Sequence, residues 1–218
     1  MVDFFSSSLA FFSPFIVVIN SPAFMLFGSP ASWAEVVGAL LGVAMVLCNI
    51  RQIHWGWPLA FVSSALYFLV FWDSKLFGDA SLQIFFAIMA AWGWWQWLRG
   101  VREDGQSLQV QALSRQGKFK LIASCAVLWG LTGLFLLNFT TTDVPWWDAF
   151  PTALSIVATF LLGRKYIENW PMWILVNIVG MALFAYKGLW LTVGLYGVFT
   201  AMAVVGWRAW RFTMKPRR

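Results

Sequence analysis

Apolar stretches joined by short polar segments limit what this chain can fold into more than any other feature of its sequence. They lie at about 35–51, 57–73, 79–98, 119–138, 148–164, 170–187 and 189–210. Of the 218 residues, 61% are hydrophobic and only 11% are charged, whereas soluble domains carry about 25% charged residues. A soluble fold of this size cannot bury so much apolar surface, so the composition predicts an integral membrane protein. Because lipid offers the backbone no hydrogen-bond partners, we expect all seven stretches to be transmembrane helices and the fold class to be all-α.

The segment 1–34 is a separate N-terminal apolar segment. Pro14, Asn20 and Pro22 interrupt its Phe-rich sequence, whereas a membrane span needs about 20 continuous apolar residues. We expect this segment to lie as an amphipathic element at the outer membrane surface. An additional spanning helix is the alternative.

The basic residues predict the orientation of the spans. If the first span runs inward, the inner segments hold Arg51, Arg99, Arg102, Arg115, Lys118, Lys120, Arg164, Lys165, Arg208, Arg211, Lys215, Arg217 and Arg218. Only Lys75 and Lys187 then fall outside. Because Lys and Arg collect on the cytoplasmic side of membrane proteins, we expect a cytoplasmic C-terminus. The N-terminus lies outside if the segment 1–34 does not cross the membrane.

The chain contains an internal repeat. The register that places Trp57-Pro58 on Trp170-Pro171 also aligns Gly93-Trp94 with Gly206-Trp207 and Trp97 with Trp210, without a gap. The alternative is coincidence between apolar helices, but composition alone would match Leu and Ala rather than these motifs. We therefore predict a first three-helix repeat at 35–99 and a second at 148–212.

The region between the repeats determines how they are related. Residues 100–147 comprise a basic cytoplasmic linker, a fourth helix and an external loop, and a basic tail follows at 213–218. Because each repeat has an odd number of spans, the single linking helix gives both repeats the same direction across the membrane. This 3+1+3 arrangement is a parallel repeat, and such transporters bind their substrate near the midplane between the halves.

No motif for catalysis, metal binding or phosphate binding is present. His54 is the single histidine and is predicted to lie at a cytoplasmic turn. The net charge of +6 follows from the basic residues that flank the spans. We expect no enzyme activity, no cofactor, no metal site and no nucleic-acid partner.

Amides and aromatic rings are the groups that the spans offer to a ligand. Gln83, Trp94 and Tyr196 lie on stripes that the two repeats share, and Asn177 is the strongest polar side chain of its span. Asn49 and Ser64 are further candidates, and Ser64 aligns with Asn177 in the repeat. A neutral amide at membrane depth costs free energy unless it is paired, which favours a substrate role over helix packing for Gln83 and Asn177.

The chemistry of these groups narrows the substrate. Aromatic rings and amides suit a flat, polar, ring-bearing solute, and the rings also attract a cation. The carboxylates fall near span ends, so passive flux is a simpler mechanism than proton coupling. A phosphorylated substrate would need a cluster of cations in its path, so we exclude it, although Arg164 and Lys165 at the inner mouth argue the other way.

The segment from Trp147 to Asn177, with the pattern WD-x6-SIVA-x6-RKYIENWPMW-x3-N, closely resembles the PnuC family of bacterial vitamin B3 transporters. The first half agrees more loosely, at WAEVVG (33–38), LQIFF (82–86) and WGWWQW (92–97). The resemblance covers about 33–212. It implies a seven-helix core of two three-helix halves in the bacterial cytoplasmic membrane and a homotrimer.

The resemblance also implies a function. The substrate would be nicotinamide riboside, taken up by facilitated diffusion and trapped by a cytoplasmic kinase. We assign Trp94 and Tyr196 to its ring, and Gln83 and Asn177 to hydrogen bonding. The gate on the cytoplasmic side is expected to comprise Arg164, Lys165, Tyr166, Glu168, Asn169 and Trp170.

Other functions fit parts of this pattern. A carrier for thiamine, another small neutral or cationic solute, or a sugar could share the architecture, since fold does not determine substrate. The aromatic content favours a planar heterocycle. A membrane scaffold or an enzyme subunit is a third hypothesis, and it predicts neither uptake nor solute binding.

Overall fold

The computed structural model describes residues 14, 17–18, 21–26, 29–73, 77–102, 105–140, 142–186 and 190–214. Its elements are β1 (Pro22–Leu26), β2 (Ser29–Ser32), α3 (Trp33–Ile50), α4 (Gly56–Asp73), α5 (Phe77–Arg99), α6 (Arg115–Phe139), α7 (Pro145–Gly163), α8 (Asn169–Tyr186) and α9 (Trp190–Thr213). The seven predicted spans correspond one to one to α3–α9, which confirms the helical prediction. Within the described residues, α6, α7 and α8 are long and apolar enough on their own to cross a membrane.

A short β-hairpin precedes the helices, and the sequence did not predict it. Pro22–Leu26 pairs antiparallel with Ser29–Ser32, with an irregularity in register between Pro22 and Phe24. The hairpin leads directly into α3. Most of the predicted N-terminal amphipathic element lies outside the described residues, so its relation to the membrane surface stays a prediction.

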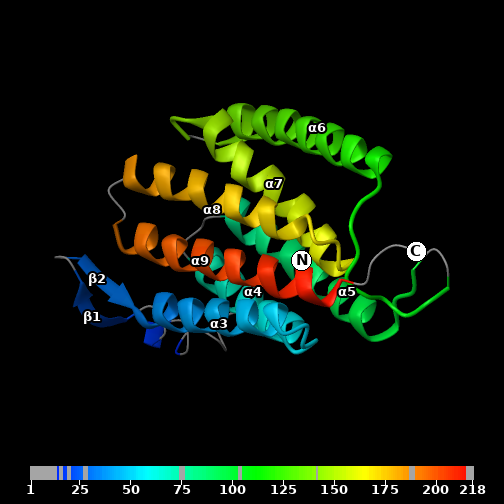
Figure 1. Ribbon diagram of the computed structural model, residues 1–218. Helices are drawn as coiled ribbons and strands as arrows, with labels where there is room; N and C mark the ends of the chain where they lie inside the picture. The colour runs from blue at the N-terminus through cyan, green and yellow to red at the C-terminus, as the bar shows by residue number, and fades with distance from the viewer. Residues whose placement is uncertain are drawn as a thin grey trace, which may run out of the picture.

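The helices form two three-helix halves with α6 attached to one side (Figure 1). Within each half, α3–α5 and α7–α9, consecutive helices pack together, and the halves meet where α3 packs on α9 and α5 on α7. Helix α6 packs on α7, where the Trp129 indole donates to the Trp146 carbonyl at 2.9 Å and the Trp146 ring lies against Gly133. The linking helix is therefore peripheral, and the interior is shared by the two halves.

The backbone of the two halves agrees in detail. Gln52 and Lys165, which the repeat register aligns with each other, are the described non-glycine residues with positive φ, at 56° and 54°. Each lies in the turn between the first two helices of its half. The Gln52 amide donates to the Asn49 carbonyl at 3.1 Å, and the Lys165 amide donates to the equivalent Leu162 carbonyl at 3.0 Å. The two halves thus share a turn geometry that few non-glycine residues adopt.

Tryptophan side chains join the halves symmetrically. The Trp97 indole of α5 donates to the Leu162 carbonyl of α7 at 3.1 Å. The equivalent Trp210 of α9 donates to the Asn49 carbonyl of α3, also at 3.1 Å. Each bond crosses from the third helix of one half to the first helix of the other, so the repeat register describes the tertiary contacts as well as the sequence.

Two glycines admit a second pair of tryptophans. The Trp57 ring lies against Gly93, and the equivalent Trp170 ring lies against Gly206, in both cases where a Cβ atom would collide with the ring. Trp57 and Trp170 are 4% and 2% exposed. Trp57 makes an edge contact with Trp97, and Trp170 makes one with Trp210. These rings form the core at one end of the bundle.

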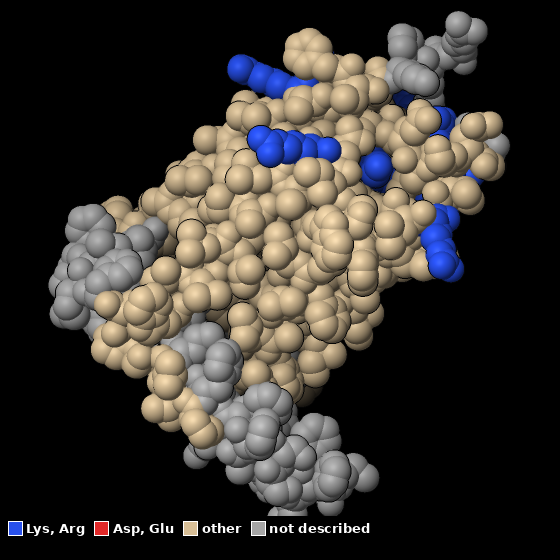
Figure 2. Space-filling model, turned by 90° about the horizontal axis from the view of Figure 1, so that it is seen from below, with Lys and Arg blue, Asp and Glu red and all other residues tan. Residues whose placement is uncertain are grey.

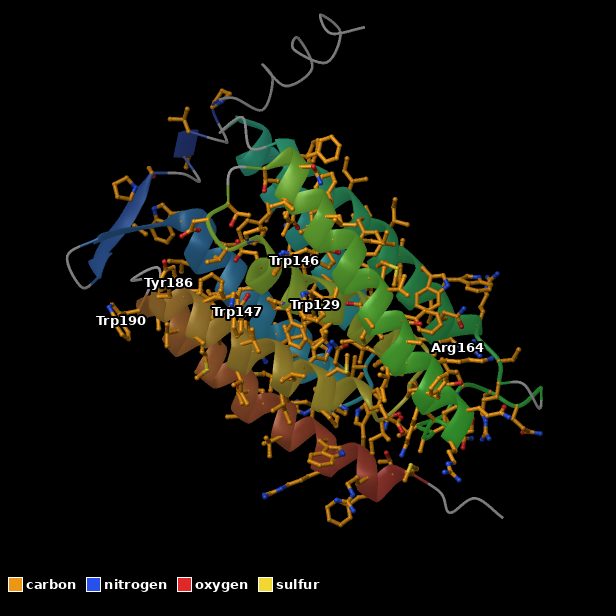
Figure 3. All side chains as sticks on the ribbon, turned by 90° about the horizontal axis from the view of Figure 1, so that it is seen from above. Trp129, Trp146, Trp147, Arg164, Tyr186 and Trp190 are labelled. Carbon is orange, nitrogen blue, oxygen red and sulfur yellow. The ribbon has the colours of Figure 1, made fainter. Side chains whose placement is uncertain are left out.

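The same end of the bundle carries the basic residues. The α3–α4 and α7–α8 turns, the α5–α6 linker and the end of α9 all lie there, away from the β-hairpin (Figure 1). Lys and Arg side chains gather towards this end in Figure 2. Arg164 lies there in Figure 3, whereas Tyr186 and Trp190 lie at the hairpin end. We call the first end the basic end and the other the hairpin end.

Candidate functional site

A cavity of about 400 Å³ lies between the two halves. Its lining comes from α3, α4 and α5 of the first half and from α7, α8 and α9 of the second, while α6 contributes nothing. The α4 lining runs from Gly56 to Tyr67, roughly 16 Å at the helical rise per residue. The cavity therefore extends from the basic end well into the bundle, and its size suits a small molecule.

Most of the predicted binding residues meet in this cavity. Asn49, Ser64, Gln83, Asn177 and Tyr196 all line it. Asn49, Ser64 and Asn177 are 5%, 7% and 5% exposed. The structure thus brings together five of the six side chains that the sequence singled out, from five different helices.

Trp94 is the exception, and its predicted place on the ring of the substrate is not where the structure puts it. Its ring does not line the cavity; it is 37% exposed and donates to His54 Nδ1 at 3.2 Å. Residues 93 and 94 flank the stripe that Gln83, Phe86 and Ala90 define on α5. Gly93 takes the inward place because the Trp57 ring fills the space in front of it, which turns Trp94 outwards.

The frame of the cavity is the same in both halves. Phe86 and Phe199 line it at equivalent positions, as do Ala90 and Ala203, and Trp57 and Trp170. Tyr196 packs on Phe184 and Phe199, with ring centroids 4.9 and 6.2 Å apart. A ring-bearing ligand would therefore meet aromatic side chains from both halves.

Four buried polar atoms of lining residues have no hydrogen-bond partner among the described residues. They are Asn49 Oδ1, Trp57 Nε1, Asn169 Oδ1 and Trp170 Nε1. Asn169 is fully buried; its amide nitrogen donates to the Tyr166 carbonyl at 2.6 Å, while its amide oxygen has no partner. A buried polar atom without a partner is costly, and these two acceptors and two donors belong to residues that line one cavity.

The polar contents differ between the halves. Asn49 of the first half aligns with Leu162 of the second, whereas Asn169 of the second aligns with Gly56 of the first. A Cβ atom at Gly56 would lie only 2.7 Å from Asn49 Oδ1. The Asn49 amide of α3 therefore occupies space that is free because α4 has a glycine at position 56. Each half therefore supplies one amide near the basic end, but from a different helix.

Several lining residues escaped the sequence analysis. Tyr67, Trp173, Ser155 and Thr159 line the cavity, and Trp57 was used only as an anchor for the repeat. The Ser155 and Thr159 hydroxyls donate to carbonyls one turn earlier in α7, both at 2.7 Å. Because Tyr67 aligns with Gly180, a search for shared positions could not find it; buried polarity within an apolar span was the signal available.

The predicted gate residues divide into two groups. Asn169 and Trp170 line the cavity, while the turn at 164–168 that precedes them contacts the α5–α6 linker. Arg164 Nη1 donates to Gln96 Oε1 at 2.9 Å, and the Glu168 carboxylate accepts the Leu113 amide at 3.0 and 3.1 Å. Tyr166 forms a parallel bridge with Gln111.

Lys165 links this turn to the tryptophan core. Its ammonium lies 4.8 Å from the centroid of the Trp97 ring, an arrangement that attracts the cation to the ring face. Burial lowers the pKa of the Lys165 side chain from its ordinary value. The turn is therefore tied to the first half by Arg164 and Lys165, and to the linker by Tyr166 and Glu168.

The cavity offers neutral chemistry. Its lining, as far as the chain is described, consists of apolar, amide, hydroxyl, phenol and indole groups without an ionisable carboxylate or cation. The described residues contain no cluster of His, Cys, Asp and Glu that could hold a metal. Such a site can stack rings and exchange hydrogen bonds with a polar solute.

Comparisons with known proteins relate this architecture to transporters. A family model described as nicotinamide mononucleotide transporter matches residues 32–212. The nicotinamide riboside transporter PnuC of Escherichia coli (strain K12) is 26% identical over 215 residues, with 87% of this chain and 90% of that protein covered. The riboflavin/roseoflavin transporter RibM of Streptomyces davaonensis is 32% identical over 198 residues, with 88% and 91% covered. A crystal structure of the vitamin B3 transporter PnuC matches the fold with a TM-score of 0.68 at 22% identity, over 96% of this chain and 91% of that one.

Proposed function

The chain belongs to the nicotinamide mononucleotide transporter family, and we propose that the substrate it carries is nicotinamide riboside. It is a multi-pass membrane protein and a vitamin transporter of the PnuC type, not an enzyme.

The observation that carries the proposal is the neutral, ring-lined cavity between the halves, whose lining includes four amide side chains. Nicotinamide riboside joins a cationic pyridinium ring with a carboxamide to an uncharged ribose. Aromatic faces attract such a delocalised cation, and amide and indole groups can pair with the carboxamide and the hydroxyls. The lining offers no cation for a phosphate, which a phosphorylated nucleotide would require.

We assign roles along the cavity. Tyr196 contacts the pyridinium ring, supported by Phe199, and Gln83 and Asn177 pair with polar groups of the substrate. Asn49 and Asn169, together with the indoles of Trp57 and Trp170, meet the opposite end of the molecule near the basic end. Ser64 is a smaller polar contact beside Asn177.

The direction of transport follows from the charges. We propose that the basic end faces the cytoplasm, because Lys and Arg collect on that side of membrane proteins. The substrate moves by facilitated diffusion and is retained inside by a kinase that phosphorylates it. The turn from Arg164 to Trp170 opens and closes the cytoplasmic exit, since it joins the cavity to the linker. We further propose a homotrimer, which the mass of the purified complex would test.

A titration of the purified protein tests the substrate. Nicotinamide riboside, its 5′-phosphate, thiamine and riboflavin are added separately while tryptophan fluorescence and calorimetric heat are recorded. We expect saturable quenching by nicotinamide riboside, because Trp57, Trp170 and Trp173 line the cavity, and at least about tenfold weaker binding of the phosphate. Equal binding of the phosphate would contradict the argument from the neutral lining.

Riboflavin is the second candidate, and the 32% identity to RibM favours it. It is also a flat ring with a polyhydroxylated chain, but its ring is neutral and tricyclic. If riboflavin binds more tightly than nicotinamide riboside, the roles assigned to the aromatic and amide side chains are kept, and riboflavin replaces nicotinamide riboside as the proposed substrate. A simple sugar, which has no aromatic ring, should not bind in either case.

A further inference from the structure

A second cavity, of about 700 Å³, lies at the basic end outside the substrate site. It is bounded by the linker before α6, by the first turns of α6, and by the last turns of α7 with the turn that follows. Arg102, Lys120 and Arg164 line it, one from each of these segments. We call it the interfacial pocket, because it lies where α6 enters the apolar part of the bundle.

The walls of the interfacial pocket are of two kinds. The cationic groups are accompanied by polar side chains, Ser114, Gln116 and Tyr166, while no Asp or Glu occurs among the described lining residues. The remaining wall is apolar and includes Leu121, Val157, Phe160 and Leu161. Phe160 is 48% exposed and stacks on Trp92, with centroids 5.4 Å apart and planes at 12°. The pocket is thus amphiphilic, cationic on one side and apolar on the other.

The start of α6 adds positive charge beside the interfacial pocket. Arg115, Lys118 and Lys120 lie in its first two turns, and its first turn contains no acidic residue. Cations at a helix N-terminus oppose the helix dipole, which favours an anion there. At the cap itself, the Ser114 hydroxyl accepts the Gly117 amide at 3.1 Å.

Glu168 shows how this region already binds one carboxylate. It accepts the Leu113 amide just before the helix and lies 4.0 Å from Lys118. The interfacial pocket, on the side of Lys120 and Arg164, has no such internal anion in its described lining. Arg164 meets Gln96 through a single nitrogen, Nη1, and a guanidinium has five N–H donors in total.

We propose that the interfacial pocket binds the phosphate group of an anionic phospholipid. Lys120 and Arg164 meet the phosphate, and the Ser114 and Gln116 side chains supply further hydrogen bonds. The apolar wall that ends at Phe160 receives the first carbons of an acyl chain, which a soluble phosphate does not possess. Basic pockets between transmembrane helices on the cytoplasmic side are suited to anionic head groups.

Occupation of this pocket would bear on the transport site. Arg164 begins the turn that continues to Asn169 and Trp170, which line the substrate cavity. A phosphate on Arg164 therefore holds the base of that turn against the linker. The proposal does not depend on which substrate is carried, and its test uses no substrate.

The test is native mass spectrometry of the full chain, released from mixed vesicles of phosphatidylcholine and phosphatidylglycerol. We expect retained phosphatidylglycerol on the unchanged protein and at least about tenfold less on Lys120→Gln, with a further loss when Arg164→Gln is added. Arg115→Gln, which removes a cation from the same helix outside the pocket lining, is the matched control and should retain the lipid. Thermal unfolding of each variant shows that it is folded.

Two results would overturn the proposal. The first is equal retention of phosphatidylglycerol by Lys120→Gln, by the double variant and by the control, which would assign the lipid to another surface. The second is displacement of the lipid by millimolar inorganic phosphate, which would make a soluble anion the occupant instead. The proposal is supported if phosphatidylglycerol retention falls only in Lys120→Gln and the double variant and if inorganic phosphate does not displace the lipid.

Discussion

The two halves of this transporter have the same frame and different polar contents. Trp57 and Trp170 pack on equivalent glycines, and Trp97 and Trp210 make equivalent bonds across the interface. Among the polar residues of the cavity the correspondence ends, because amides and hydroxyls occupy positions whose partners are apolar or of another type. A duplicated scaffold has kept the contacts that join the halves and has diversified the surface that faces the ligand. An asymmetric substrate requires such a difference.

The halves also differ at their basic-end turns. The turn at Lys165 is covered by the α5–α6 linker, through bonds between Gln111 and both Lys165 and Ile167. The equivalent turn at Gln52 meets the end of α9 instead, where Gln52 Nε2 donates to Thr213 Oγ1 at 3.2 Å. The same backbone geometry therefore occurs in a covered turn in one half and in a more open turn in the other.

The largest effect is expected from breaking the shared frame. Gly206→Leu and Gly93→Leu each drive a side chain into a buried tryptophan ring that has no room to move, and overpacking of this kind costs about 1–3 kcal/mol or more. Both variants should lose folded protein to a similar extent, measured as monodisperse yield and unfolding temperature. Gly197→Leu on α9, where nothing lies within 4 Å, is the control. A large difference between the two frame variants would contradict the equivalence of the halves.

The next effect concerns the polar pair at equivalent places, Asn177 and Ser64. Asn177→Ala removes an amide from a buried position and should weaken nicotinamide riboside binding about tenfold. Ser64→Ala should weaken it by only about threefold, because a hydroxyl makes fewer hydrogen bonds than an amide. Binding titrations and uptake into vesicles measure both, with unfolding temperature as the check on folding. Unchanged uptake by Asn177→Ala would remove this residue from the site.

A third prediction makes the halves more alike. Asn49→Leu gives the first half the residue that the second half carries at position 162, and it keeps the backbone carbonyl that Trp210 binds. We expect normal folding and about fivefold weaker substrate binding, through loss of the Asn49 Oδ1 acceptor. Leu162→Met, an apolar change of similar volume at the equivalent place, should bind normally. Equal affinities for the two variants would show that Asn49 is structural.

The smallest effect tests the two crossing indole bonds. Trp97→Phe and Trp210→Phe each remove one donor, at a cost of about 1 kcal/mol for the bond itself, which corresponds to roughly 2–4 °C in unfolding temperature. Trp95→Phe, at a 55% exposed position of α5, should change the unfolding temperature little. If only one of Trp97→Phe and Trp210→Phe lowers the unfolding temperature, the two bonds are equivalent in geometry but not in their contribution to stability.

Much of this fold could be predicted from the sequence because lipid restricts the backbone so severely. Seven apolar stretches had to be helices, and the Trp-Pro and Gly-Trp registers revealed the repeat without any structure. The β-hairpin at 22–32 could not be foreseen, since its two prolines and short strands carry no clear alternation. Apolar composition sets the helices, but it says little about short segments beside them.

The site was predicted in part, and the failures have a common cause. Buried amides in an apolar helix must be paired, which identified Asn49, Asn177 and Gln83. A helical stripe cannot decide between neighbouring positions such as Gly93 and Trp94, because the bulk of the facing ring determines which one points inwards. Tyr67 was missed because its equivalent in the second half is Gly180. A search for residues shared by the halves cannot find the cavity residues in which the halves differ.

The structure of this protein with bound nicotinamide riboside tests the central claim most directly. We predict one substrate molecule between the halves, with its pyridinium ring at Tyr196, an amide contact to Asn177, and its other end beside Asn49 and Asn169. The polar contacts from the two halves should come from non-equivalent positions. A substrate bound outside this cavity, or held by one half alone, would contradict the account.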